Sequence, residues 1–390
     1  MAVKQNNMPP QPGSPQYDAA ARAGILRYGV DRLQPIFNQA FTPANQNIVN
    51  VPPQNVGLLR GFLVKVSGTL RNTDGVTGAT RTEFGASNLL TNIQFTDINN
   101  QVRHQTQGWH VGLVNSAKQP MVFGGAYAPN VPVNYGNNFD VQTCPSTLAD
   151  ATDAAVQFFY YIPISYGKYD FRGAMWAGVT NAVAQLQLTI NPNPFADTGS
   201  DPGLAVFQGA SGVWKSGTTV NIQVWQDYID QIPLMADNNP ILPISDIQLL
   251  YQLNNTTFSG LVQSQDFNVP FANFRSYLST CLVYDNGGSF NAGTDINHFM
   301  LQTANQSQIW KYGPEEAALL ARTTFLADPP KGVYYFDHRA RPISTQQFGN
   351  MQITLNPSTV NSNAAIWAGW EYLAQASQVV YASSLGGSGN

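Results

Sequence analysis

A seven-residue strand pattern occurs twice in the chain and constrains its fold more than any other feature of the sequence. Residues 186–192 read LQLTINP, and residues 351–357 read MQITLNP. In both copies polar and apolar side chains alternate, which is typical of a β-strand with one buried face. An Asn-Pro pair then ends each pattern, because proline has no N–H to donate to a sheet. The repetition predicts two related β domains in tandem.

Three further pairs of segments echo one another in the same order along the two halves. They are RGFL at 60–63 and RSYL at 275–278, the tyrosine pairs at 160–161 and 334–335, and DYIDQ at 227–231 and EYLAQ at 371–375. Each match is weak by itself. Because four matches in one order arise by chance much less often than one, the sequence indicates a duplicated fold.

The composition is that of an all-β protein with many turns and few charges. The chain has 390 residues, which suits two domains of ordinary size, and it contains 33 glycines and 25 prolines. Only 11% of residues are charged, and four are glutamates: Glu83, Glu315, Glu316 and Glu371. A surface poor in charge favours a protein whose flanks are covered by neighbouring subunits, since charge is depleted from interface cores. Some extracellular β proteins share this bias, and that alternative stays open.

Net charge and cysteine usage restrict the partners and the compartment. A formal charge of −4 and a pI near 5.5 argue against direct nucleic-acid binding, which needs a clustered basic surface. Cys144 and Cys281 lie in different halves, so we expect no disulfide framework and synthesis in a reducing cytoplasm. The first residues lack the apolar stretch of a signal peptide, and no apolar run approaches eighteen residues, so we expect no membrane span.

The N-terminal arm carries the candidate site of this chain. Residues 1–16 are rich in proline and glutamine and are expected to be flexible, whereas residues 17–40 have an apolar stripe at helical spacing, interrupted by Pro35. The stripe and the basic residues beside it form a candidate membrane- or partner-facing surface: Arg22, Leu26, Arg27, Val30, Arg32, Leu33 and Phe37. Packing on its own domain or on a neighbouring subunit is the alternative to lipid contact. One net positive charge contributes about 1 kcal/mol at an anionic membrane, so lipid contact would require many copies on one surface.

The predicted organisation has five parts. They are an arm at 1–40, a first β domain at 41–233, a proline-rich linker at 234–243, a second β domain at 244–376 and a flexible tail at 377–390. Strands are expected at 56–70, 89–95, 156–164, 183–190, 220–229, 274–284, 332–337, 351–355 and 364–373. One helix is expected to begin at Pro314 in a loop of the second domain, with Glu315 and Glu316 in its first turn.

The sequence contains no convincing catalytic or metal-binding constellation. His104, His110, His298 and His338 do not form the paired spacing of a metal site, and no nucleophile elbow, phosphate loop or zincin motif occurs. Glu315 and Glu316 are consecutive, so on a helix they would point in different directions and serve the helix dipole. Asp285 is expected to begin a tight turn instead of a calcium loop. We therefore expect no enzyme activity and no cofactor.

Several segments resemble the major capsid proteins of tectiviruses, which are tailless bacteriophages with a membrane inside the shell and are related in fold to the adenovirus hexon. The resemblance covers roughly residues 40–376. It rests on NVGLLRGFLVKV at 55–66, GWHVGLVNSAKQ at 108–119, DNGGSFNAGTDIN at 285–297, PKGVYY at 330–335 and the second Asn-Pro strand with Val360-Asn361.

The resemblance implies a double jelly roll of two eight-stranded domains, an N-terminal amphipathic helix and helices inserted in loops. It also implies a homotrimer whose six jelly rolls make a pseudo-hexagonal capsomer, with long loops outward and the arm near an internal membrane. The expected partners are other copies of the chain, the vertex (penton), spike and minor capsid proteins, and that membrane. The expected location is the virion shell, after assembly in the host cytoplasm.

Two alternatives from other classes remain at this stage. One is a spike or glycan-binding β-sandwich protein, in which the many aromatic residues would line a sugar cleft. The other is a double jelly-roll hydrolase acting on glycans, which would need converging carboxylates that a chain with four glutamates hardly supplies.

Overall fold

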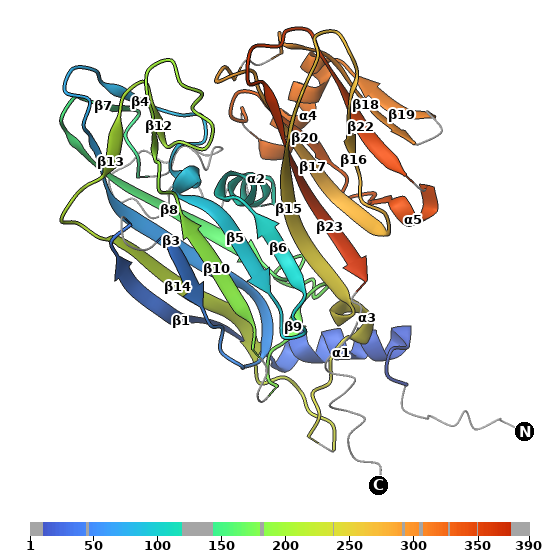
Figure 1. Cartoon of the computed structure of the whole chain (residues 1–390). Coiled ribbons are helices and arrows are strands. Elements are labelled where there is room, and N and C mark those ends of the chain that lie inside the picture. Colours follow the sequence, from blue (N-terminus) through green and yellow to red (C-terminus); the bar gives the residue numbers. More distant parts are fainter. Residues whose placement is uncertain are drawn as a thin grey trace, which may run out of the picture.

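Two β-sandwich lobes lie side by side in the computed structural model, which describes residues 11–43, 47–118, 143–179, 183–236, 238–290, 293–303, 307–326, 328–348 and 350–375. Figure 1 shows the N-terminal lobe on the left and the C-terminal lobe on the right. The predicted tail at 377–390 and the first ten residues of the arm lie outside the described ranges.

The first lobe is built from eight principal strands in two facing sheets. One sheet has the spatial order β1 (Val30–Phe41), β14 (Val220–Asp230), β3 (Leu58–Asn72) and β8 (Asp153–Pro163). The other has the order β2 (Ile48–Val51), β10 (Gln185–Ile190), β5 (Leu90–Thr96) and β6 (Val102–Thr106). If the eight principal strands are numbered one to eight along the chain, the first sheet contains the first, eighth, third and sixth strands. The second sheet contains the second, seventh, fourth and fifth.

The second lobe repeats this topology. Its two sheets have the order β15 (Leu249–Ser259), β23 (Ala365–Gln375), β17 (Arg275–Asp285) and β20 (Val333–Asp337), and the order β16 (Phe267–Pro270), β22 (Met351–Pro357), β18 (Ile296–Thr303) and β19 (Gln308–Tyr312). The predicted fold of two tandem eight-stranded jelly rolls is therefore confirmed.

Short elements complete the two lobes. A small sheet at the loop end of the first lobe contains β4 (Ala79–Arg81), β7 (Thr147–Leu148), β11 (Phe195–Ala196) and β12 (Phe207–Gln208). The strands β9 (Met175–Trp176), β13 (Gly212–Trp214) and β21 (Ile343–Ser344) extend the larger sheets. The helices are α1 (Pro15–Tyr28), η1 (Gly85–Leu89), α2 (Gly108–Lys118), α3 (Ile244–Ile247), α4 (Pro314–Phe325) and α5 (Thr345–Phe348).

All four sequence echoes lie on equivalent strands of the two lobes. LQLTINP and MQITLNP fall on the seventh strands, β10 and β22, and the tyrosine pairs fall on the sixth strands, β8 and β20. Ladder registers also align the eighth strands. Tyr161 lies opposite Leu63 and Tyr335 opposite Cys281, so Gly61, two residues before Leu63, corresponds to Ser279, two residues before Cys281. Asp227 lies opposite Gly61 and Glu371 opposite Ser279. RGFL and RSYL lie on the third strands of the two lobes, β3 and β17. The echo would make Gly61 equivalent to Ser276, whereas the ladder registers make it equivalent to Ser279. That echo is thus three residues out of register.

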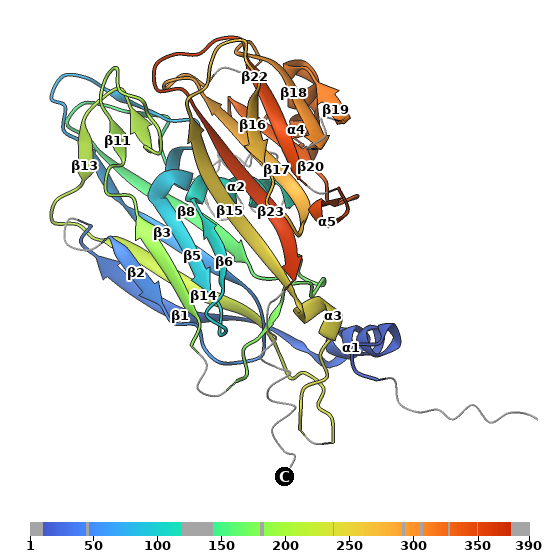
Figure 2. The same cartoon turned by 45° about the vertical axis from the view of Figure 1, so that its right-hand side comes forward.

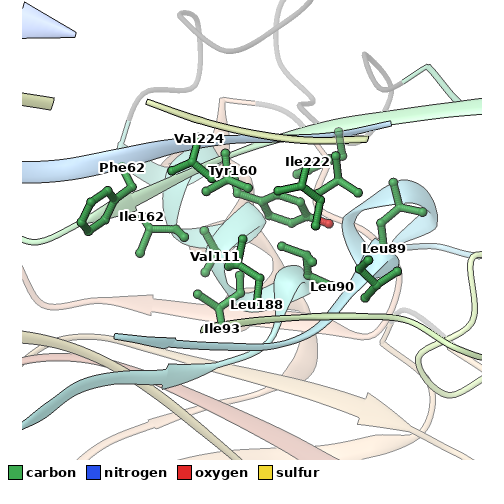
Figure 3. Packing of buried hydrophobic residues seen from close by; sticks show 14 of the residues in the cluster. Phe62, Leu89, Leu90, Ile93, Val111, Tyr160, Ile162, Leu188, Ile222 and Val224 are labelled. Carbon is green, nitrogen blue, oxygen red and sulfur yellow. The ribbon is translucent and has the colours of Figure 1, made fainter. Parts of the chain in front are cut away.

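The core of the first lobe lies between its sheets. Phe62, Tyr160, Ile162, Leu188 and Val224 are buried there, as Figure 3 shows. The Tyr160 hydroxyl donates to the carbonyl oxygens of Ala86 (3.1 Å) and Ser87 (2.9 Å) in η1, so the polar end of this ring is satisfied inside an apolar core. A second apolar cluster fills the second lobe between its own two sheets.

One continuous sheet joins the lobes. The fifth strand of the first lobe, β6, runs parallel to the first strand of the second lobe, β15, with Leu253 opposite His104 and Asn254 opposite Gln105. This pairing merges two four-stranded sheets and β21 into a nine-stranded sheet. The lobes are therefore linked through backbone hydrogen bonds as well as through side chains.

The predicted helix over 17–40 is wrong in its second half. Helix α1 ends at Tyr28, and Val30–Phe41 form β1, paired along its length with β14. Gly29 separates the two elements, where a Cβ would lie 2.6 Å from the Ile25 carbonyl oxygen. Pro35 cannot continue a helix but is tolerated on an edge strand, where a bulge follows it. We therefore propose to begin the first jelly roll at residue 30 and to keep the other predicted boundaries.

Candidate functional site

The two lobes contact each other through a buried cluster of aromatic and aliphatic side chains. Figures 1 and 2 place α2 between the lobes. Trp109 of α2 and Phe84, both in the first lobe, pack against Trp367 of the second, with ring centroids 5.8 and 5.7 Å apart. Large aromatic side chains supply much of the apolar area buried in such contacts. Strand β23 is consequently buried on both faces over residues 366–374.

A buried ionic cluster lies within this interlobe contact. The Glu371 carboxylate of β23 binds the Lys118 ammonium at the end of α2 at 3.0 Å and the Arg339 guanidinium at 2.6 Å. It also accepts hydrogen bonds from the hydroxyls of Tyr251 (2.7 Å) and Ser279 (2.8 Å). Burial alone would raise the pKa of Glu371, but the two cations outweigh it and hold this pKa well below the usual range.

A glycine makes room for the first lobe in the middle of the cluster. The His110 ring of α2 rests on Gly369 of β23, where an added Cβ would meet the ring at 2.5 Å. The His110 Nδ1 atom is 2.7 Å from the Thr106 hydroxyl, and burial lowers the pKa of His110 to about 4. A neutral imidazole packed on bare backbone is a structural contact between the lobes.

The corresponding outer face of the first lobe is open and contains a pocket. This pocket has a volume of about 340 Å³ and is lined by residues of β1, β3, β8 and β14, by the segment that follows β8, and at one side by Asn115 and Lys118 of α2. Arg60 lies at its base and binds Asp31 at 2.8 Å and Asp227 at 2.5 Å, and the Tyr161 hydroxyl donates to Asp227 at 2.7 Å. Leu33 and Leu63 form its apolar wall.

Three of the predicted arm residues, Arg22, Leu26 and Arg27, lie on α1. This helix is bound to α3, at the end of the chain that we call the base. Arg22 forms a bidentate pair with Asp246 of α3 at 2.6 and 2.7 Å. Asp18 accepts the backbone N–H groups of Ile244 (2.8 Å) and Ser245 (3.3 Å) at the start of α3. The opposite face of α1 stays exposed, with Leu26 at 53% and Tyr28 at 58% exposure and Arg27 beside them.

The other four predicted residues, Val30, Arg32, Leu33 and Phe37, lie on β1. Arg32 approaches Asp230 at 3.7 Å, and Leu33 is 55% exposed at the pocket. Phe37 stacks on Phe41 with centroids 6.1 Å apart. Because α1 contains Leu26 and β1 contains the other three apolar residues, Leu26, Val30, Leu33 and Phe37 do not form the single apolar stripe at helical spacing that the sequence predicts.

The histidines occupy ordinary structural positions. The His104 Nδ1 atom accepts the Leu253 N–H at 3.0 Å, its Nε2 lies 2.7 Å from the Pro163 carbonyl oxygen, and burial lowers its pKa to about 3. Burial likewise lowers the pKa of His338 to about 4. His298 lies 3.5 Å from Asp266. Across the described residues, no three His, Cys, Asp or Glu side chains gather as a metal site. Nor do these ranges hold a helix that is long and apolar enough to span a membrane.

The predicted turn after β17 is present and meets the first lobe. Asp285 accepts the Gly288 N–H at 2.7 Å, as a tight turn requires. Burial, together with the neighbouring Asp201 carboxylate of the first lobe, raises the pKa of Asp285 to about 7. The predicted positions of Glu315 and Glu316 are also confirmed, in the first turn of α4.

Comparison with known protein families shows what this duplicated fold does. Residues 21–232 match the model of the P3 major capsid protein N-terminal domain, and residues 248–387 match that of the C-terminal domain. The chain belongs to the P3 major capsid protein family. It is 38% identical over 367 residues to the major capsid protein P3 of Enterobacteria phage PRD1, covering 94% of this chain and 93% of that protein. This P3 family member is therefore a major capsid protein, and its function is structural.

Solved structures of other viral capsid proteins share the fold of this P3 family member. The major capsid protein of Sulfolobus Turreted Icosahedral Virus matches with a TM-score of 0.62 and 10% identity, over 92% of this chain and all of that one. VP54 of PBCV-1 matches with a TM-score of 0.56 and 13% identity, over 89% and 95%. These matches support the double jelly roll. The comparisons give no support to the spike, glycan-binding or hydrolase alternatives.

The sequence predictions missed the interlobe site. Lys118 and Glu371 are far apart in the chain, and periodicity does not pair them. One signal was present: Glu371 is a lone charge inside the apolar strand AIWAGWEYLA at 365–374, and it matches Asp227 in the echo of the eighth strands. A charge in a continuous apolar run marks a strand buried on both faces, with a partner for that charge.

Proposed function

We propose that three copies of this chain form a trimeric capsomer of six jelly rolls. The observation that supports this proposal is the equivalence of the two lobes, strand for strand and in the same spatial order. A threefold molecule built from such a chain presents six similar domains around its axis. It can therefore occupy a position with six neighbours although it has only three subunits.

Such capsomers would tile an icosahedral shell through lateral contacts between trimers. Vertex (penton), spike and minor capsid proteins are the further protein partners that we propose. Cys144 and Cys281 are both unpaired and buried, which is compatible with assembly in a host cytoplasm.

The base of the capsomer is proposed to face an internal membrane. Leu26, Arg27 and Tyr28 form an exposed patch with one basic residue at the end of α1. Figures 1 and 2 show α1 and α3 together at the end of the molecule away from the small sheet. One charge contributes about 1 kcal/mol at an anionic surface, so stable contact depends on many copies held in one shell.

The native mass of the purified chain tests the trimer directly. We expect a mass of three times 42.5 kDa in mild buffer, and particles with a six-sided outline in negative stain. Dilution should not release monomers, because an obligate interface of about 2,000 Å² or more does not dissociate readily. A stable monomer under these conditions would contradict the proposal.

A further inference from the structure

Within one chain, the contact between lobes joins a fifth strand to a first strand. In this contact β6 pairs with β15, and the second lobe inserts side chains into the core cluster of the first, including Tyr251 and Leu253. Leu253 is fully buried as a result. The chain therefore contains one complete example of how a jelly roll of this type binds the next.

The equivalent strands in the other positions, the first strand of the first lobe and the fifth strand of the second, each have one edge without a strand partner in the part of the chain that the structure describes. The first strand of the first lobe, β1, pairs with β14 on one side, and the fifth strand of the second lobe, β19, pairs with β18 on one side. Neither has a strand partner on its other side within the described ranges. An exposed row of backbone N–H and C=O groups is a template for pairing with another chain.

Ladder registers identify the residue on β1 that corresponds to Leu253. Leu253 lies opposite Glu371, and Leu33 lies opposite Asp227, which is the counterpart of Glu371. Leu253 is 0% exposed, whereas Leu33 is 55% exposed. Tyr161 and Asp227 of the 340 Å³ pocket likewise correspond to Tyr335 and Glu371. Both belong to the filled interlobe cluster, where the Tyr335 hydroxyl accepts a hydrogen bond from Arg339 at 2.6 Å. The pocket is thus the unfilled copy of an interface that is complete elsewhere in the chain.

From this equivalence we infer that β19 of one copy pairs in parallel with β1 of the next, near Leu33 and Gln34, and that this copy covers the pocket of its neighbour. Ile309 of β19, 48% exposed, supplies an apolar side chain at the joining edge. Pro35 lacks an N–H and so keeps the new ladder as short as the two-residue ladder between β6 and β15. Repeated head to tail, the contact closes after three copies into a ring with sheet pairing at all six junctions.

This inference rests on the proposed trimer and specifies its contact. Two single-cysteine variants, Leu33→Cys and Ile309→Cys, and the double variant Leu33→Cys/Ile309→Cys test it when treated with a short bifunctional thiol cross-linker. Such a reagent tolerates a register shift of a residue or two. Cys144 and Cys281 are buried and should not react in the folded protein. Val76→Cys, on a connecting segment at 87% exposure, is the control for collisional cross-linking.

We expect the double variant to give mainly covalent trimers in a denaturing gel. Co-expression of the two single variants, which lets mixed trimers assemble, should give dimers that contain one chain of each. Neither single variant alone, nor the control, should give a discrete cross-linked band above the monomer. Dimers from Leu33→Cys alone would show two β1 edges in contact and would overturn the inference. Uncross-linked double variant in a sample whose native mass is trimeric would also overturn it and leave the trimer intact. A monomeric native mass would instead remove the proposed function itself.

Discussion

At the scale of single residues, ionisable groups buried between the lobes link the architecture to pH. Asp285 lies in the second lobe against Asp201 of the first, and burial raises its pKa to about 7 from an ordinary 3.8. The folded protein therefore keeps a proton on this carboxyl group between about pH 4 and 7, where the unfolded chain has lost it. The free energy of unfolding must then fall as the pH rises through this window.

The variant Asp285→Asn should remove this pH dependence. An asparagine oxygen can still accept the Gly288 N–H, but the side chain cannot ionise. We expect the parent and the variant to be similarly stable at pH 4 and the variant to be more stable at pH 8, by up to about 4 kcal/mol. Denaturant midpoints measured across this range check the prediction. Asp328→Asn is the control, because the Asp328 side chain is 75% exposed. If the stability of the parent and that of Asp285→Asn changed in parallel with pH, this prediction would be wrong.

At the scale of elements, α1 has a bound face and a free face with different expected roles. Tyr17, Ala21 and Ile25 are buried against the base of the chain, and the exposed patch of Leu26, Arg27 and Tyr28 points away from it. The role of the arm could be tested by deleting residues 1–36, but this deletion would remove more than half of β1 together with the helix. Point substitutions on the exposed face of α1 are therefore the sharper test.

We expect Leu26→Glu/Tyr28→Glu to leave folding and trimer mass unchanged, since exposed substitutions alter stability by about 0.5 kcal/mol or less. Acidic residues on this patch should reduce shell assembly or the retention of lipid in particles, measured by particle yield and lipid content. Val76→Glu is the matched control, in the connection to β4 at the other end of the molecule (Figure 1). Loss of the trimer in the first variant would identify α1 as a clasp between subunits.

Local sequence patterns predicted the elements that have one buried face. The expected strands at 220–229 and 351–355 became β14 and β22 within a few residues, because alternation in a half-buried strand is visible in the chain. The helix at Pro314 was predicted from its proline and its two glutamates, both of which act locally.

Elements whose structure depends on distant contacts were not predicted. Helix α2 closes the gap between the sheets of the first lobe, and Val111 and Val114 are buried in a core that its own sequence does not reveal. Strand β15 begins with buried residues on both faces, because Leu250 packs in the core of the second lobe and Tyr251 and Leu253 pack in that of the first. In β1, apolar residues happen to recur at helical spacing, and only pairing with β14 makes the segment a strand.

At the scale of the whole molecule, each of the two jelly rolls has its own core, and a shared contact joins them. This contact consists of a parallel ladder, an aromatic cluster and the buried ion pair of Glu371 with Lys118. We therefore expect the parent chain to unfold in a single calorimetric transition, with neither lobe melting before the other.

Glu371→Gln should divide this transition into two. The substitution leaves Lys118 and Arg339 without their shared counterion inside the protein, and removing one partner of a buried ion pair costs about 3–5 kcal/mol. Glu83→Gln is a matched control, because Glu83 also bridges the lobes, to Lys331 at 3.6 Å, but this pair is partly exposed and should contribute about 1 kcal/mol or less. Because Lys118 crosses the contact whereas Arg339 and Ser279 belong with Glu371 to the second lobe, the loss should lower the transition of the second lobe and leave that of the first little changed. A uniform downward shift of one transition in Glu371→Gln would show that the ladder and the aromatic cluster alone couple the two jelly rolls.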